Sequence, residues 1–251
     1  MEKQNCHQVL INNAFYDDLK DGWYESTDHP VALLRAENKV RVPWVIESVK
    51  ANFSKSCHIL DIGCGAGMLA NALALEQHNV TGIDLSKPSL EVAQKYDRTN
   101  SVKYKQASAY DLPFSDQSFD VVTAMDVLEH VEDPFKLIKE GSRVLRHGGL
   151  FFFHTFNRNW LSYFLVIKGV DWFVPNAVAN MHVYDLFIKP KKLQEMGFKN
   201  GLKLKKIMGF RPKILQKPLW NMIFHRDISE GFSFIFTKSL STGYSGYFIK
   251  Q

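Results

Sequence analysis

The sequence has few cysteines and no long uncharged apolar segment. Cys6, Cys57 and Cys64 are the three cysteines among 251 residues, and their spacing fits neither a metal site nor a disulfide framework. This usage predicts a reducing, cytoplasmic setting. No apolar run reaches the roughly 18 residues of a membrane span, and the N-terminus lacks the apolar core of a signal peptide. We therefore expect a cytoplasmic chain that at most lies peripherally on the inner face of a membrane.

Internal repeats, low-complexity tracts and a strong excess of one charge are also missing. The chain has 31 basic and 26 acidic residues, a net charge of +5, and 45% of its residues are apolar. This composition indicates a folded core and excludes the disordered class. The small charge excess and the lack of a recognised binding motif argue against nucleic acid as a partner.

The order of apolar and amphipathic segments predicts an α/β fold. Short apolar runs alternate with helical patterns between residues 55 and 156, as expected for βαβ units around a mostly parallel sheet. Helices are predicted at Met68–Gln77, Ser86–Tyr96 and Pro134–Leu145, and Asp133 is the expected N-cap of the last. The length suits one domain with additions better than two full domains.

A glycine-rich turn follows the first predicted strand. In "LDIGCGAG", Gly63, Gly65 and Gly67 stand between a strand and a helix, where bare backbone at a helix N-terminus can pack against a ligand. The dinucleotide pattern G-x-G-x-x-G places its third glycine one residue later. The negative charge of Asp61, just before the turn, disfavours a pyrophosphate and suits the cationic S-adenosyl-L-methionine. A tight turn without a ligand is the alternative.

Asp84 closes the next predicted strand, "VTGID". A carboxylate at this point can accept hydrogen bonds from both hydroxyls of a ribose, as it does in NAD enzymes. Asp84 therefore indicates an adenosine nucleoside without choosing the cofactor. The alternative interpretation is that Asp84 caps the following helix.

These motifs together resemble the class I S-adenosylmethionine-dependent methyltransferases. The matching segments are "LDIGCGAG", "GIDLS", "LPFSDQSFDVV", "LEHVEDP" and "RVLRHGGLFFF", in this order over about residues 55–155. The resemblance implies a Rossmann-like α/β fold with a mostly parallel seven-stranded sheet, helices on both faces and a helical cap. It also implies that the three glycines lie against the amino-acid part of the cofactor, that Asp84 binds the ribose and that Leu85 packs on the adenine. Where many members have an acid that contacts the adenine amine, this chain has Ser108, with Asp111 nearby.

Longer segments are similar to the ubiquinone-biosynthesis O-methyltransferases, which methylate polyprenyl catechols and demethylubiquinol. These segments are "ALLRAENKVRVPWV", "VVTAMDVLEHVEDP", "HTFNRN" and "HVYDLFIKPKKL", within about residues 14–210. The similarity implies a catechol quinone precursor as substrate and other quinone-biosynthesis enzymes as partners. It implies that Arg41 reaches the cofactor's carboxylate, a charge-assisted contact, and that Met125 lines the cofactor site. A surface salt bridge is the alternative for Arg41.

The segment "MDVLEHV" combines two carboxylates with an imidazole. On a helix, Asp126, Glu129 and His130 would share one face. The resemblance implies a divalent cation there, magnesium or zinc, which would lower the pKa of a catechol hydroxyl. Alternatively, His130 alone is the catalytic general base, or Glu129 and His130 only shape the turn. Many members have glutamate in place of Asp126, so the ligand set departs from the family pattern.

We expect a single domain, residues 1–251, in four parts. The N-terminal segment 1–50 is helical, residues 55–156 form the cofactor-binding core, residues 157–218 form a cap and a basic arm, and residues 219–251 form closing strands. Within the third part, the apolar stretch "NWLSYFLVIKGVDWFVPNAV" is either a buried cap over the substrate or an interfacial helix whose aromatic side chains enter lipid. The ten basic residues and one acid that follow, between residues 186 and 218, form either a solvated face or an arm that attracts anionic headgroups.

The sequence therefore predicts an S-adenosylmethionine-dependent O-methyltransferase that acts on a phenolic or catechol quinone precursor. Two alternatives remain open. One is a methyltransferase of the same fold that acts at carbon or nitrogen of another small acceptor. The other is a cofactor-binding regulatory protein that has lost catalysis, although the retained glycines, Asp84 and the acids of "DVLEH" argue against such a loss.

Overall fold

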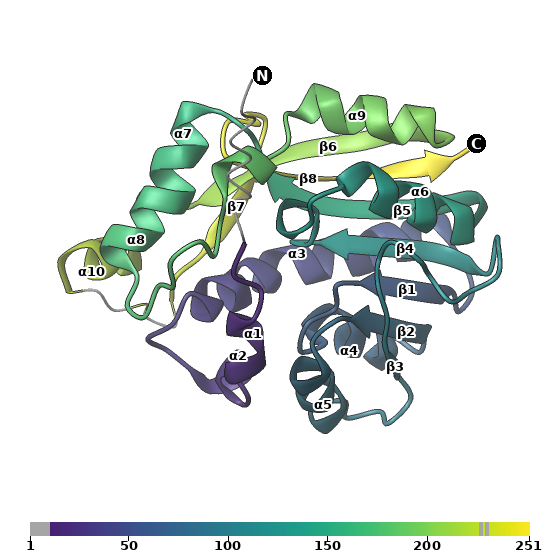
Figure 1. Cartoon of the computed structure of the whole chain (residues 1–251), viewed down its shortest axis with the longest axis horizontal. Helices are drawn as coiled ribbons and strands as arrows, with labels where there is room; N and C mark the ends of the chain where they lie inside the picture. The colour runs from purple at the N-terminus through teal and green to yellow at the C-terminus, as the bar shows by residue number, and fades with distance from the viewer. Residues whose placement is uncertain (1–10, 226–227, 229–230) are drawn as a thin grey trace, which may run out of the picture.

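The computed structural model describes residues 11–225, 228 and 231–251, and these residues contain one eight-stranded sheet (Figure 1). Its strand order is β3-β2-β1-β4-β5-β8-β6-β7. The strands from β3 to β5 are parallel, whereas β8 pairs antiparallel with both β5 and β6, and β7 pairs antiparallel with β6. The predicted α/β class is confirmed, and the sheet has one strand more than the seven expected, since β7 adds a short strand at the edge. The strands are β1 His58–Ile62, β2 Asn79–Asp84, β3 Lys103–Gln106, β4 Phe119–Met125, β5 Leu145–Phe156, β6 Leu202–Pro212, β7 Phe234–Thr237 and β8 Gly243–Lys250.

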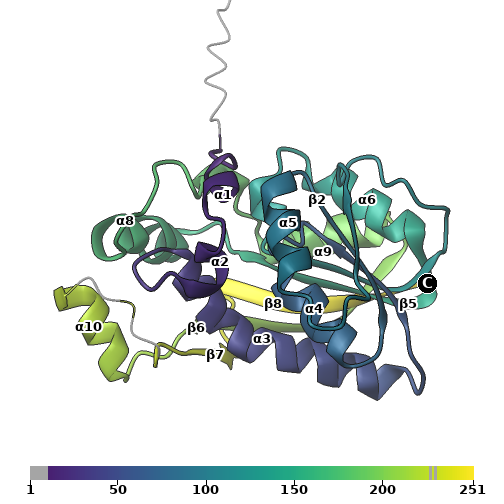
Figure 2. The same cartoon turned by 90° about the horizontal axis from the view of Figure 1, so that it is seen from below.

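Helices cover both faces of the sheet (Figure 2). Helices α3 and α4 pack on one face, and α6 and α9 pack on the other. Two short N-terminal helices, α1 and α2, lie beside the carboxyl ends of the parallel strands (Figure 2). The chain between β5 and α9 forms a cap. The helices are α1 Phe15–Asp18, α2 Gly22–Glu25, α3 Val31–Asn52, α4 Met68–Leu75, α5 Lys87–Lys95, α6 Pro134–Val144, α7 Trp160–Ser162, α8 Gly169–Phe173, α9 Pro190–Lys199 and α10 Lys217–His225.

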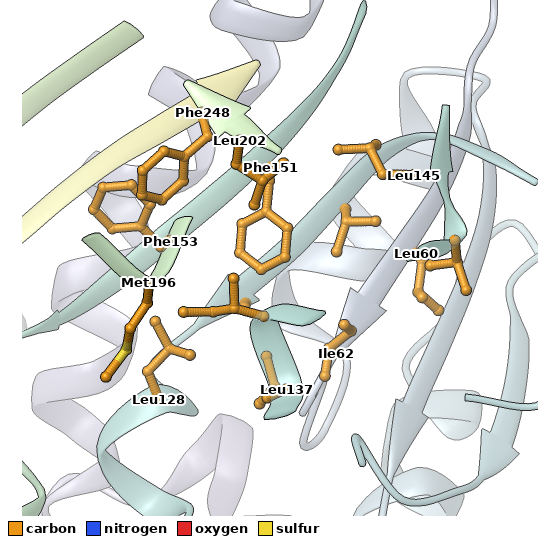
Figure 3. Close-up of a cluster of buried hydrophobic side chains, with 14 of the residues drawn as sticks. Leu60, Ile62, Leu128, Leu137, Leu145, Phe151, Phe153, Met196, Leu202 and Phe248 are labelled. Atoms are coloured by element: carbon orange, nitrogen blue, oxygen red, sulfur yellow. The ribbon is translucent and has the colours of Figure 1, made fainter. Parts of the chain in front are cut away.

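The core follows from the alternation of side chains along the strands, which sends successive residues to opposite faces. In β5, Phe151 and Phe153 point toward α6 and α9, while Phe152 between them packs with α3 and α4. Figure 3 shows the first of these two clusters, in which Leu60 of β1 and Leu137 of α6 also meet. Because both faces are buried, the sequence of β5 reads as a continuous apolar run rather than an alternating one.

The three predicted helices of the core correspond to α4, α5 and α6, each slightly shorter than expected. Asp133 caps α6 as predicted, since its side chain accepts a hydrogen bond from the backbone N–H of Lys136 at 3.1 Å. The predicted closing strands contain β7 and β8, but the segment 219–251 begins inside α10, which the sequence analysis did not anticipate. The first ten residues of the predicted helical segment 1–50 lie outside the described residues.

The cap consists of α7, a π-helical segment over Tyr163–Lys168 and α8, followed by a loop and the short 3-10 helix Tyr184–Leu186. The cap helix α8 lies next to α10 at one end of the molecule (Figures 1 and 2). Among the described residues, no helix combines the length and the apolar character needed to cross a membrane.

Candidate active site

A cavity of about 470 Å³ lies where β1, β2 and β4 reach their carboxyl ends. In open parallel sheets this edge is the usual place for a ligand, because the loops that leave the strands can diverge there. The N-terminal helices supply Tyr16 and Trp23 to its wall, and the cap supplies Leu165 and Val170. The cavity therefore joins residues that are far apart in the sequence.

The glycine turn forms one end of this cavity, although its three glycines do different things. Gly63 and Gly65 line the cavity, whereas Gly67 does not. A Cβ on Gly67 would lie 2.2 Å from the hydroxyl oxygen of Tyr104, and its φ of +75° falls in the left-handed region. Gly67 thus allows α4 to start close against the sheet. The structure places this residue in packing rather than on the ligand surface to which the sequence analysis assigned it.

Asp84 lies on the cavity wall and organises the glycine turn. Its two carboxylate oxygens accept hydrogen bonds from the backbone N–H groups of Gly65, at 2.8 Å, and Ser86, at 2.9 Å. The helix α5 is capped by Ser86, whose hydroxyl accepts from the N–H of Ser89, so Asp84 is not its N-cap. A carboxylate oxygen can accept more than one hydrogen bond, so these two bonds do not exclude a further one from a ligand in the cavity. Leu85, next to it, also lines the cavity and is exposed.

Asp61 lies on the buried floor of the cavity, beneath the glycine turn. Its carboxylate accepts a hydrogen bond from the Thr123 hydroxyl at 2.5 Å. Burial raises the pKa of Asp61 to about 7, although the bond from Thr123 opposes this shift. A cationic ligand nearby would favour the ionised form of this carboxyl group.

Arg41 does not line the cavity. Its guanidinium is 1% exposed and lies 2.6 Å from the Oδ1 of Asp126 and 3.1 Å from the Oε2 of Glu37. It also donates to the side-chain oxygen of Asn38 at 3.0 Å. The expected alternative, a surface salt bridge, is wrong because this ion pair is buried. The predicted contact between Arg41 and a cofactor carboxylate stays a prediction. The observed geometry favours a structural role, in which the ion pair of Arg41 with Asp126 holds α3 against the end of β4.

The part of the cavity wall that follows β3 is less polar than expected. Ala107 and Ala109 line it, while Ser108 between them does not. The hydroxyl of Ser108 accepts a hydrogen bond from the backbone N–H of Tyr110 at 3.2 Å, which closes the local turn. Asp111 is exposed and also absent from the cavity lining. Met125, at the end of β4, lies on the wall where the sequence analysis placed it.

The segment after β4 is not an α-helix. Asp126 has a φ of +58°, and Leu128–His130 form a single 3-10 turn. Asp126, Glu129 and His130 nevertheless all face the same cavity. Both carboxyl oxygens of Glu129 and the Nδ1 of His130 are buried without a hydrogen-bond partner. Among the described residues, these atoms at the cavity wall have no hydrogen-bond partner within normal distance, which is costly unless a ligand supplies one.

Burial also sets the protonation of these groups. Desolvation raises the pKa of Glu129, and the neighbouring charge of Asp126 adds to this shift, so the neutral acid is favoured. Desolvation lowers the pKa of His130 to about 4, against the opposing effect of Asp126. The imidazole of His130 is therefore neutral near pH 7, with one nitrogen able to accept a proton.

The arrangement fits a divalent cation only in part. Glu129 and His130 offer ligand atoms without partners, but Asp126 is already bound by the Arg41 cation. In the described part of the chain, the three ligand atoms that approach within 4.8 Å of one another belong to Glu37, Asp126 and His154. Arg41 bonds two of these three, so a second cation among them would be repelled. The predicted set of Asp126, Glu129 and His130 does not form such a cluster.

Two parts of the wall are not predicted from the sequence. The first is the N-terminal pair Tyr16 and Trp23, whose stacked rings have centroids 5.3 Å apart. The second is His182, which comes from the loop after α8 and lies with its ring centroid 5.5 Å from that of His130. Its segment, "HVYDLFIKPKKL", was matched as a family feature without a role for its histidine. No periodic sequence pattern predicts that these side chains line the cavity, because tertiary packing brings them there.

Comparisons with known proteins identify the chain. Residues 60–153 match the family model described as "Methyltransferase domain". The chain is 32% identical over 242 residues to a ubiquinone biosynthesis O-methyltransferase of Coxiella burnetii, a match covering 94% of this chain and 98% of that one. It is 37% identical over 209 residues to a protein of the same name from Pseudomonas syringae pv. tomato, covering 81% and 88% of the two chains.

The chain belongs to the ubiquinone biosynthesis O-methyltransferases. Its fold also resembles that of magnesium protoporphyrin IX methyltransferase from Synechocystis PCC 6803, solved with bound S-adenosylhomocysteine. That similarity has a TM-score of 0.66 at 15% identity and covers 96% of each chain, so it supports the fold alone. The resemblance inferred from the motifs is therefore confirmed at the level of the family.

We predict that Asp84→Ala weakens the binding of S-adenosylhomocysteine by about 1.5–3 kcal/mol. The reason is the loss of hydrogen bonds from the ribose hydroxyls to the charged carboxylate. Calorimetric titration measures this affinity. Asp133→Ala is the control, since it removes the cap of α6 and costs about 1 kcal/mol of stability at a residue that does not line the cavity. An unchanged affinity in Asp84→Ala would show that Asp84 only holds the glycine turn.

Proposed function

We propose that this chain transfers the methyl group of S-adenosyl-L-methionine to a phenolic oxygen of a catechol-type quinone precursor in ubiquinone biosynthesis. One observation carries the proposal: a single cavity joins the Asp84 and glycine-turn end to the partnerless groups of Glu129 and His130. The first end suits a nucleoside, and the second suits an acceptor with an acidic hydroxyl. The names of the relatives support the ubiquinone pathway.

In the proposed mechanism, the chain acts mainly by alignment and by excluding water. Asp84 and the backbone of Gly63 and Gly65 hold the cofactor, and Leu85 and Met125 pack against it. The acceptor oxygen attacks the methyl carbon as the bond from that carbon to the sulfonium breaks. Its proton passes to the free nitrogen of the neutral His130. Positioning of two reactants in one closed site supplies a large share of such a rate enhancement.

A divalent cation is the alternative source of hydroxyl activation. Glu129 and His130 would hold it, with Asp126 contributing only if Arg41 releases it. When bound, a magnesium or zinc ion would lower the pKa of the acceptor hydroxyl. The base mechanism through His130 requires no rearrangement of the buried ion pair, and the geometry therefore favours it.

We expect methyl-labelled S-adenosylmethionine to give a labelled aryl methyl ether with a water-soluble catechol, detected by NMR of the product. Activity should persist in chelator and should fall by roughly a hundredfold or more in His130→Ala, the usual range for loss of a general base. Loss of activity in chelator, with recovery on addition of magnesium or zinc, would instead establish the metal.

The same assay separates the alternatives. Label at carbon or nitrogen would assign a different acceptor, and binding of S-adenosylhomocysteine with no transfer to any catechol would indicate a regulatory protein. Full activity in His130→Ala and in Glu129→Gln would show that Glu129 and His130 take no part in the mechanism.

We further propose that the cap docks on an anionic membrane surface, where a polyprenyl substrate would reside. The cap exposes large apolar side chains, with Trp160 73% and Trp172 57% exposed. Val170 and Leu165, which is also partly exposed, line the cavity. The adjacent α10 exposes Trp220. Arg211, Lys213 and Lys217 lie just before α10 or at its start, and no acid occurs from residue 211 to residue 225. Apolar anchors beside basic charge are typical of interfacial binding.

Wild-type protein should sediment with vesicles containing anionic lipid and be released by salt, which screens charges beyond about 8–10 Å. Trp160→Ser combined with Trp172→Ser should weaken this binding and leave affinity for S-adenosylhomocysteine intact. Phe198→Ser is the control, because Phe198 is 79% exposed on α9, away from the cap. The docking proposal is wrong if the wild type fails to sediment at low salt, or if the control loses as much binding as the double variant.

A further inference from the structure

His182 is a polar side chain of the cavity wall to which the proposed mechanism gives no task. It comes from the cap loop, between the buried residues Met181 and Val183. Aromatic rings hold its imidazole on two sides: its centroid lies 5.3 Å from that of Phe156, edge-on, and 6.3 Å from that of Phe187. The ring is thus fixed in orientation by packing.

The nitrogens of this imidazole have no hydrogen-bond partner among the described residues. Within residues 11–225, 228 and 231–251, the contacts found for His182 are ring contacts and electrostatic effects, without a hydrogen bond. A neutral imidazole carries one N–H donor and one acceptor nitrogen. Because the ring lines the cavity, this donor and this acceptor are available to a bound molecule.

His130 and His182 form adjacent places on the same wall. Their ring centroids are 5.5 Å apart, and their planes are inclined by 49°. A catechol carries two hydroxyls on neighbouring carbons, so one ring can present an oxygen to each imidazole. If only His130 were engaged, the second hydroxyl would enter the pocket without a hydrogen bond, which is unfavourable for a polar group removed from water.

We propose that His182 binds the hydroxyl that is not methylated, and thereby makes the site prefer ortho-diphenols over monophenols. This inference rests on the proposed function, since it takes the acceptor to be a phenol that lies against His130. His182 is a specificity-determining residue in this arrangement, while the proton of the methylated oxygen still goes to His130. The hydrogen bond also ties the cap loop to the acceptor.

The test measures binding rather than turnover, so it does not depend on methyl transfer. 4-Nitrocatechol and 4-nitrophenol are titrated into the complex of the protein with S-adenosylhomocysteine, and the absorbance of each ring reports its binding. The wild type should bind the catechol more tightly than the phenol. His182→Phe keeps a ring of similar size between Phe156 and Phe187, and should weaken catechol binding by on the order of tenfold, as expected for one hydrogen bond. Its affinity for the phenol should be unchanged.

Two further variants complete the experiment. His182→Gln retains a donor and an acceptor and should keep most of the preference for the catechol. His58→Gln, an exposed position at the start of β1, should behave as the wild type. Equal weakening of both ligands in His182→Phe, or no weakening of either, would overturn the inference. If the wild type shows the preference and His182 governs it, but no methyl is transferred, the proposed function fails while the binding role stands.

Discussion

The buried ion pair between Arg41 and Asp126 connects the parts from which the cavity is built. Arg41 comes from α3, which belongs to the N-terminal segment, and Asp126 follows β4 at the carboxyl edge of the sheet. Glu37 lies against the same guanidinium, and His154 of β5 is 3.6 Å from Asp126. Burying these charges is costly, and loss of one partner would leave the other uncompensated. The pair therefore fixes where α3 lies relative to the turn that carries Glu129 and His130.

The cavity has two regions. At one end, Asp84 and the glycine turn present backbone and a carboxylate to a nucleoside. At the other, His130 and His182 face a space closed by Phe156 and by the inner side of the cap. The cap thus has two roles in the proposed scheme: its inner side covers the acceptor, and its outer aromatic side chains meet lipid. In that scheme, the cap and the docking helix that the sequence leaves as alternatives are two sides of one segment.

The sequence predicts those features that depend on local chemistry. Strand and helix order, the Asp133 cap and the position of Asp84 follow from apolar runs and turn residues, whose effects act over a few residues. It misplaces features that depend on contacts across the fold. Gly67 packs near Tyr104 of β3, and Ser108 turns away from the cavity. The helical face expected for Asp126 and His130 is absent, because Asp126 adopts a left-handed conformation at the end of β4.

Arg41 shows most clearly which contacts the sequence does not reveal. A basic residue ahead of the glycine turn is compatible with a ligand contact, and its spacing in the chain says nothing of Asp126, 85 residues later. His182 could not be found either, since its neighbour His130 lies 52 positions away and only the cap brings them together. These are long-range contacts, which periodicity does not encode.

The most direct test of the role of this ion pair compares the affinities of the Arg41→Met variant for two ligands. S-adenosylhomocysteine carries the amino-acid carboxylate, whereas 5′-methylthioadenosine lacks it and keeps the nucleoside. Breaking the buried pair should lower the free energy of unfolding by about 3–5 kcal/mol and weaken both ligands by the same factor. Unchanged stability with weaker binding of S-adenosylhomocysteine alone would contradict this arrangement, and would place Arg41 on the cofactor's carboxylate instead.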